Sequence, residues 1–400
     1  MPILEDIRVQ HLTRFEGALD PKGKKPEVSL IVANYNNEAY IDECILSLKN
    51  QTFKDMEIII VDDASSDKGV DKLKAYALED NRIKLFLNSV RTGHPSLARN
   101  YGVSIAQGKY IAFVDSDDYL NLDCVRLHYE SLESSLADIA YCNLDVYDES
   151  KNEHHPFKLN HASTKGSLVF NASNANREFW RKVRTSACFN MYKKEFFVKE
   201  ELAFQDCDFE DTDVAIVAFL RAKSLCHIPK TLYVARINKK YGYNRSDGAK
   251  SSTSLADPLV GINILCHSYK LLGLKGTKGF EEGLLYAYFD LFTYFLHIFA
   301  TEENFFTCIK EAKSLLEEVY EDSTKKFTYF NPNEMRFIKL LLKKSPVELM
   351  KECIIYHRAN NLDVRGLLLN SINHVQYARY PKVIKYPLYI YKIMLKIAGK

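Results

Sequence analysis

The sequence lacks the features of secreted chains. Its nine cysteines are scattered singly, with no CxxC pair, and their odd number does not fit a complete set of disulfides. We therefore expect reduced thiols, most of them small core residues, in a cytoplasmic protein. The first residues, MPILEDIRVQHLTRF, are acidic and polar where a signal peptide needs an apolar run.

Long apolar runs are also missing. The most apolar segment, residues 284–300, contains Asp290 and His297. It is shorter than the roughly 20 apolar residues that cross a bilayer. The pattern therefore predicts a buried helix rather than a membrane span.

Negative charge is absent from the C-terminal end of the chain. No Asp or Glu follows Asp363, whereas Lys and Arg recur up to Lys400. Residues 380–400 mix lysine with Tyr, Ile and Leu. This composition suits peripheral contact with an anionic inner membrane surface, worth on the order of 1 kcal/mol for each Lys. The alternative is a last helix that packs on its own domain or on a second subunit. Nucleic-acid binding is not expected, because basic residues are few and no known module is present.

What is present is the composition of an ordinary globular protein. The 400 residues are 46% hydrophobic and 26% charged, which predicts two or three domains. We divide the chain into a leader segment over 1–26, an α/β domain over 27–250 and a helical domain over 251–400. If the protein forms a homo-oligomer, we expect the interface to lie on the helical domain.

Segments typical of strands and of helices alternate through the first part of the α/β domain. The predicted strands are 28–33, 56–61, 83–87 and 110–114, and the predicted helices are 39–51, 68–78 and 96–106. Because the strands are almost continuously apolar, the pattern predicts a mostly parallel sheet with helices on both faces. The polar residues 149–165, which include His154, His155 and His161, are interpreted as an inserted loop, with metal binding by the histidines as the alternative.

Polar clusters follow three of the predicted strands. Residues 34–37 read NYNN, residues 62–67 read DDASSD, and residues 115–118 read DSDD. Each cluster alone is typical of a turn. In an open parallel sheet, however, ligands bind beyond the carboxyl ends of the strands. The three clusters together predict a ligand site at one edge of the sheet.

The segment 115–118 places three carboxylates at the end of a buried strand. Crowded like charges raise the free energy unless a cation lies among them. Mg²⁺ and Mn²⁺ prefer such hard oxygen ligands. Taken alone, the segment fits a divalent metal site and a solvated acidic turn equally well. The two neighbouring polar clusters favour the metal.

The arrangement of these motifs resembles the family 2 glycosyltransferases. The motifs are VSLIVANYN at 28–36, SLKNQTF at 47–53, VDDASSD at 61–67, ARN at 98–100, GKY at 108–110 and DSDD at 115–118. The resemblance covers about residues 27–125 closely and 180–250 more loosely, and it does not extend to the C-terminal third. Where the family often has Pro, this chain has Ala33, which changes backbone stiffness rather than chemistry.

The resemblance implies a GT-A nucleotide-binding fold and a set of nucleotide contacts. Tyr35 is expected to lie on the nucleobase, and Asp63 to accept hydrogen bonds from the base or ribose. Arg99 is expected to help hold the nucleotide, with an internal ion pair as an equal alternative. The full set assigned to nucleotide binding is Ala33, Tyr35, Asp63, Arg99, Asp115 and Ser116.

The acidic motif itself is the D-x-D element of that family. The resemblance implies that Asp117 coordinates Mg²⁺ or Mn²⁺ directly. Asp115 is expected to be a second metal ligand, nearer the ribose or a metal-bound water, and Asp118 to orient its neighbours. Asp62 is interpreted as a turn or helix-cap residue.

A later acidic segment supplies the candidate general base. The family carries an acidic pair at a helix start, which corresponds here to Glu210 and Asp211. We predict Asp211 as the base, with Glu210 as second choice. Mutual repulsion among nearby carboxylates raises their pKa values, while a helix N-terminus lowers them. The alternative is a structural role at the start of the helix.

The predicted activity is an inverting, metal-dependent transfer of a sugar. The donor is a nucleotide-diphosphate sugar, with a UDP-sugar favoured, and the acceptor is a hydroxyl of a glycan, polysaccharide or lipid-linked saccharide. The alternative is a non-catalytic GT-A-like protein that binds a nucleotide or glycan within an assembly. A sugar nucleotidyltransferase would need a Gly-rich phosphate loop after the first strand, where this chain has residues 34–37.

Overall fold

The structure is a computed structural model that describes residues 11–18, 25–157, 169–171, 186–205, 210–237 and 240. Internal contacts divide the chain into two units, Met1–Gly248 and Ala249–Lys400, and all described residues belong to the first. The predicted helical domain over 251–400, with the apolar segment and the basic tail, lies outside the described residues. None of the helices that the structure describes is long and apolar enough to cross a membrane.

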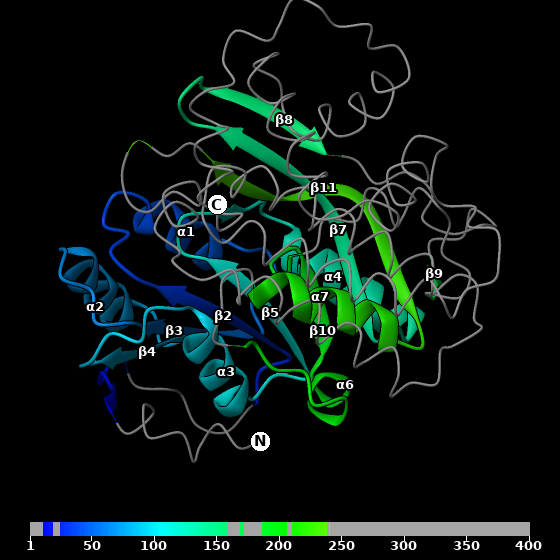
Figure 1. The fold of residues 1–400 in the computed structure, drawn as a ribbon, viewed down its shortest axis with the longest axis horizontal. Coiled ribbons are helices and arrows are strands. Elements are labelled where there is room, and N and C mark those ends of the chain that lie inside the picture. The colour runs from blue at the N-terminus through cyan, green and yellow to red at the C-terminus, as the bar shows by residue number, and fades with distance from the viewer. Residues whose placement is uncertain are drawn as a thin grey trace, which may run out of the picture. The chain divides into compact units, whose positions relative to one another are not determined.

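Alternating strands and helices build the first part of the sheet (Figure 1). They are β1 (Leu12–Arg14), β2 (Val28–Asn34), α1 (Ile41–Lys49), β3 (Met56–Asp62), α2 (Gly69–Glu79), β4 (Ile83–Asn88), α3 (Ser96–Ile105) and β5 (Tyr110–Asp115). Every strand and helix predicted between residues 28 and 114 is therefore present. Part of the predicted leader also joins the sheet, because β1 pairs with β4.

The second part of the sheet is less regular. Its elements are β6 (Tyr119–Leu120), α4 (Cys124–Ser135), β7 (Ile139–Asp148), β8 (Glu153–Phe157), β9 (Val169–Phe170), β10 (Asn190–Lys193), α6 (Lys194–Lys199), α7 (Glu210–Arg221) and β11 (Leu225–Ile237). The prediction of a loop over 149–165 is wrong for β8, which pairs antiparallel with β7. The pairing is supported by His154, which stacks on Tyr147 and contacts Asp145 at 2.7 Å.

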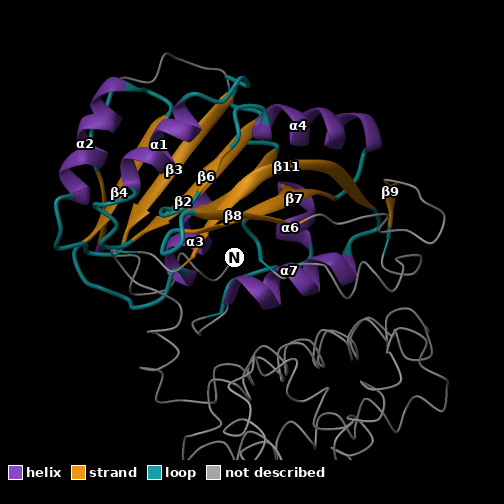
Figure 2. Ribbon diagram, turned by 90° about the horizontal axis from the view of Figure 1, so that it is seen from above, coloured by secondary structure: helices purple, strands orange, loops and turns teal. Residues whose placement is uncertain are grey.

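The described strands form one sheet in the order β1-β4-β3-β2-β5-β10-β7-β11-β6. Strands β4, β3, β2 and β5 are parallel to one another, as predicted. Beyond β5 the sheet is mixed, because β10 runs antiparallel to both β5 and β7. Figure 2 shows α1, α2 and α4 along one face of the sheet and α3, α6 and α7 along the other. The α/β class with helices on both faces is confirmed.

The central strand β2 is buried and aligns the ends of its two neighbouring strands. Its side chains from Val28 to Val32 are buried, which matches its continuous apolar sequence. In the ladder, Ala33 lies opposite both Val61 of β3 and Asp115 of β5. The carboxyl ends of the three strands therefore lie at the same level, and the polar residues after each strand meet at one edge.

An aromatic cluster packs between strand β5 and helix α3. Phe113 of β5 makes edge contacts with Tyr192 and Phe204, with ring centroids 5.9 and 4.8 Å apart. The ring of Phe204 lies 5.3 Å from the Arg99 guanidinium. Phe204 therefore packs between Phe113 of β5 and Arg99 in the first turn of α3.

Candidate active site

The three polar clusters predicted from the sequence meet in the structure. The side-chain amide of Asn34 donates to Asp62 at 2.7 Å, which links the ends of β2 and β3. The amide of Asn37 donates to the hydroxyl of Ser116 at 2.5 Å, which links β2 to the turn after β5. Asp62 also accepts from the backbone N–H of Ser65 at 3.0 Å, the turn role expected for it.

Asp115, Asp117 and Asp118 form the acidic group that the sequence predicted. One carboxylate oxygen from each lies within 4.8 Å of the others. Asp115 and Asp117 are partly exposed, whereas Asp118 is buried. Among the residues that the structure describes, this is the group of His, Cys, Asp or Glu side chains that fits a cation. Its donors are hard carboxylate oxygens, which suit Mg²⁺ or Mn²⁺.

Arg99 makes the internal ion pair that the sequence left as one of two alternatives. Its Nη2 donates to Oδ1 of Asp115 at 2.7 Å, and its side chain is 5% exposed. The same carboxylate oxygen accepts from the thiol of Cys188 at 3.3 Å. Sequence reasoning missed Cys188, because a single cysteine before a strand carries no catalytic signal.

Asp118 is held by β11 rather than by solvent. The hydroxyl of Tyr233 donates to its Oδ2 at 2.6 Å, and the backbone N–H of Arg236 donates to its Oδ1 at 2.8 Å. Burial raises the pKa of Asp118 well above its usual range, and the charges of Asp117 and Asp115 raise it further. Asp118 is therefore fixed by β11, and its role in orienting Asp115 and Asp117 stays a prediction.

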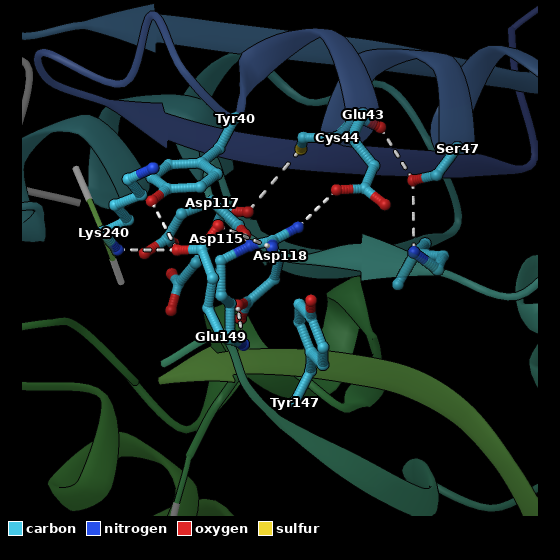
Figure 3. A network of polar contacts seen from close by, with 12 residues as sticks. Tyr40, Glu43, Cys44, Ser47, Asp115, Asp117, Asp118, Tyr147, Glu149 and Lys240 are labelled. Atoms are coloured by element: carbon cyan, nitrogen blue, oxygen red, sulfur yellow. Dashed lines mark hydrogen bonds and ion pairs between the residues drawn. The ribbon is translucent and has the colours of Figure 1, made fainter. Parts of the chain in front are cut away.

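A network of polar contacts surrounds the acidic turn (Figure 3). Tyr40 donates to a carboxylate oxygen of Glu149 at 2.7 Å. The thiol of Cys44 lies 3.6 Å from the carbonyl oxygen of Asp115, and the hydroxyl of Ser47 accepts from the N–H of Leu120 at 3.1 Å. Side chains of α1 thus fix the backbone on both sides of the turn.

The carboxylate of Asp63 accepts hydrogen bonds from the loop between β4 and α3. It accepts hydrogen bonds from the backbone N–H groups of Thr92 and Gly93, at 2.9 and 3.1 Å, and from the Thr92 hydroxyl at 2.9 Å. Gly93 has a φ of 94°, which favours glycine. In the same loop, the guanidinium of Arg91 lies 4.2 Å from the ring centroid of Tyr35. The nucleobase roles of Tyr35 and Asp63 stay predictions.

Asp211 lies in the first turn of α7 and is buried. Its charge acts on Cys188, the residue that also contacts Asp115. Burial raises the pKa of the Cys188 thiol, and Asp115 and Asp211 add to the rise. The candidate base and Asp115 are therefore linked through the Cys188 thiol, on which the charges of both act. Glu210 begins α7.

Together the mixed sheet and the carboxylates at its strand ends resemble the GT-A fold. Residues 29–199 match the family model described as Glycosyl transferase family 2. The N-terminal region of the chain is therefore similar to this family.

Curated relatives are similar over about half of the chain. The chain is 34% identical over 219 residues to the uncharacterized glycosyltransferase EpsJ of Bacillus subtilis (strain 168), which is 53% of this chain and 62% of that protein. It is 29% identical over 214 residues to the glycosyltransferase GlyG of Streptococcus pneumoniae, which is 52% of this chain and 70% of that protein. The chain therefore spans about three fifths of the length of EpsJ.

A solved structure shows the same fold. The crystal structure of S. aureus TarS residues 1–349 in complex with UDP-GlcNAc has a TM-score of 0.62 and 19% sequence identity to this chain. The similarity covers 89% of this chain and 93% of the TarS chain.

Proposed function

We propose that the protein is an inverting, metal-dependent glycosyltransferase that uses a nucleotide-diphosphate sugar. The observation that carries the proposal is the group of three carboxylates, Asp115, Asp117 and Asp118, whose oxygens lie within 4.8 Å of one another after strand β5. The match of residues 29–199 to the model of glycosyl transferase family 2 supports the reaction class.

Asp117 and Asp115 would hold Mg²⁺ or Mn²⁺. Their partial exposure leaves them accessible to a ligand, whereas Asp118 is engaged by Tyr233 and Arg236. The bound cation would supply positive charge that neutralises the departing diphosphate. Arg99 and Cys188 orient the Asp115 carboxylate through its Oδ1.

Asp211 would take the proton from the acceptor hydroxyl as this hydroxyl attacks the anomeric carbon. A single displacement of this kind forms the new glycosidic bond, breaks the bond to the diphosphate and inverts the configuration. The carboxylate is suited to the task because it is not among the residues of the acidic turn, which are expected to hold the cation. Glu210 is the second candidate for this role.

The donor is proposed to be a UDP-sugar. TarS, which shares the fold, was solved with UDP-GlcNAc. The acceptor class is suggested by relatives that match shorter stretches. One is the poly(ribitol-phosphate) beta-glucosyltransferase of Bacillus spizizenii, 38% identical over 115 residues, or 28% of this chain and 18% of that protein. We therefore propose a glycan, polyol-phosphate polymer or lipid-linked saccharide acceptor, reached from the cytoplasm.

The proposal is tested by release of the free nucleotide from a panel of UDP-, GDP- and dTDP-sugars. The full chain is incubated with each donor in Mn²⁺, in Mg²⁺ and in EDTA. We expect slow release from one donor class, abolished by EDTA. Nucleotide binding without release from any donor, with or without acceptor, would instead favour the non-catalytic alternative.

A further inference from the structure

Arg236 of β11 has a buried side chain beside the acidic turn. Its side chain is 5% exposed, and its guanidinium forms ion pairs with Glu43 and, at 3.6 Å, with Glu149. By composition alone, the segment around Arg236 fits a polar loop, which either closes over the donor diphosphate or is a solvated linker between domains. The structure instead places Arg236 inside a strand.

The guanidinium is enclosed by aromatic rings as well as carboxylates. The ring centroids of Tyr40, Tyr147 and Tyr119 lie 4.8, 5.1 and 5.8 Å from its central carbon. Figure 3 shows Tyr40, Glu43, Tyr147 and Glu149 gathered beside Asp117 and Asp118. Cation–π contacts and ion pairs in a desolvated setting hold the side chain in one position.

From this position Arg236 contacts the backbone of the acidic turn. Its Nε donates to the carbonyl oxygen of Asp117 at 3.1 Å, while its backbone N–H donates to Oδ1 of Asp118. Three residues earlier on β11, the hydroxyl of Tyr233 donates to Asp118 and lies 3.3 Å from the backbone N of Asp115. One strand therefore touches all three acidic residues of the turn.

We propose that Arg236 is a positioning residue that holds the Asp115–Asp118 turn in the conformation that presents its carboxylates together. Three like charges repel one another, so the turn needs fixed donors to stay closed before a cation arrives. Arg236 supplies one such donor, and Glu43, Glu149 and the tyrosines fix its direction. A direct contact with the donor diphosphate does not fit a side chain that is 5% exposed and paired with two carboxylates. The catalytic consequence rests on the proposed function, whereas the conformational one does not.

Hydrogen exchange tests the conformational part. The reporter is the backbone N–H of Asp118, which donates to the carbonyl oxygen of Asp115 at 3.0 Å. We compare the wild type with Arg236→Lys and Arg236→Gln in the full chain, without metal. We expect exchange in the peptide spanning 115–120 to become at least tenfold faster in both variants, because neither side chain reproduces the Nε contact together with the two ion pairs. Peptides from β2 and β3 should be unchanged.

Arg82→Lys is the matched control. Arg82 also pairs with a carboxylate, Asp80, at 2.7 Å and donates to the carbonyl oxygen of Lys49 at 2.9 Å. None of the described side-chain contacts of Arg82 involves the acidic turn. This variant should leave exchange at 115–120 at the wild-type rate. If Arg236→Gln does not fold, Arg236→Lys, which keeps the charge, decides the question.

Mn²⁺ binding, followed by electron paramagnetic resonance, tests the catalytic part. We expect Arg236→Lys to weaken Mn²⁺ binding about tenfold, in the range typical of residues that support metal ligands, and to lower kcat more than it raises the donor KM. Unchanged exchange at 115–120 in Arg236→Lys would overturn the proposal. So would a rise in donor KM alone, which would indicate a direct diphosphate contact. A wild type that binds no Mn²⁺ and releases no nucleotide would refute the proposed function, and hydrogen exchange would still decide the role of Arg236.

Discussion

The thiol of Cys188 donates to Oδ1 of Asp115 at 3.3 Å, the same oxygen that receives the Arg99 guanidinium at 2.7 Å. Burial raises the pKa of Cys188 well above its ordinary value of 9.0, so the sulfur keeps its proton and stays a donor. One carboxylate of the D-x-D motif is therefore oriented by two buried groups from different parts of the chain.

Replacement of Cys188 by Ala should lower activity without unfolding the protein. The lost hydrogen bond is worth about 1 kcal/mol, so kcat/KM should fall about fivefold. Cys188→Ser keeps a donor at this position and should retain most of the activity. Cys226→Ala, another buried cysteine, serves as control. Equal activity in Cys188→Ala and the wild type would show that the thiol only fills space.

Replacement of Asp117 by Asn should remove metal-dependent nucleotide release. Asp117 is expected to hold the cation that stabilises the departing diphosphate. Loss of such a group lowers kcat on the order of 100-fold or more. The melting temperature should change little, because Asp117 is partly exposed. Asp71→Asn, an exposed position in α2, should behave as wild type. A fully active Asp117→Asn variant would place the cation elsewhere.

Replacement of Asp211 by Asn should separate binding from transfer. An amide cannot accept the proton of the acceptor hydroxyl, so transfer should fall by roughly 10²- to 10⁴-fold. Binding of the free nucleotide, measured by calorimetry, should be retained. Normal transfer by this variant would make Glu210 or another residue the base.

Stabilisation by Mn²⁺ should increase with pH. Burial and the charges of Asp117 and Asp115 raise the pKa of Asp118 above its ordinary value of 3.8. A carboxyl with a raised folded-state pKa contributes stability that is present below the ordinary value and is lost as pH rises through the folded-state pKa. Above pH 4, the metal-free protein therefore loses this contribution, and a cation restores it. Melting temperatures in EDTA and in Mn²⁺ should diverge as pH rises above 4, and a constant difference would contradict the prediction.

Replacement of Gly108 by Ala should destabilise the fold. An added Cβ would lie 2.6 Å from the backbone N of Ser29 and 2.7 Å from the carbonyl carbon of Val28. Overpacking against backbone costs about 1–3 kcal/mol, measured by urea unfolding. In Gly102→Ala the nearest atom, at 2.4 Å, belongs to the side chain of Ile31, which can rotate. That variant should lose less stability, and the reverse order would show that the Gly108 turn can shift.

The parallel half of the sheet could be predicted because its signals are local. Strand β2 is apolar at nearly every position, and such a run suits a strand covered on both faces. The residues after β2, β3 and β5 were expected to meet because parallel strands end at the same edge. The order of β10, β7 and β11 was not predicted, since it depends on pairings between distant segments. Strand β8 was missed because its histidines and proline are not typical of strands.

The sequence by itself determined the class of the domain, the acidic turn and the candidate base, because chain order and residue type specify which groups follow which strands. Only the tertiary structure decided how the turn is held. Cys188 reaches Asp115 from 73 positions away, and Arg236 reaches Asp117 from 119 positions away. Neither contact can be predicted from the spacing of nearby residues, because each depends on the order of the strands in the sheet. The carboxylates at 115–118 could be predicted from the sequence, whereas the hydrogen-bond donors that hold them could not.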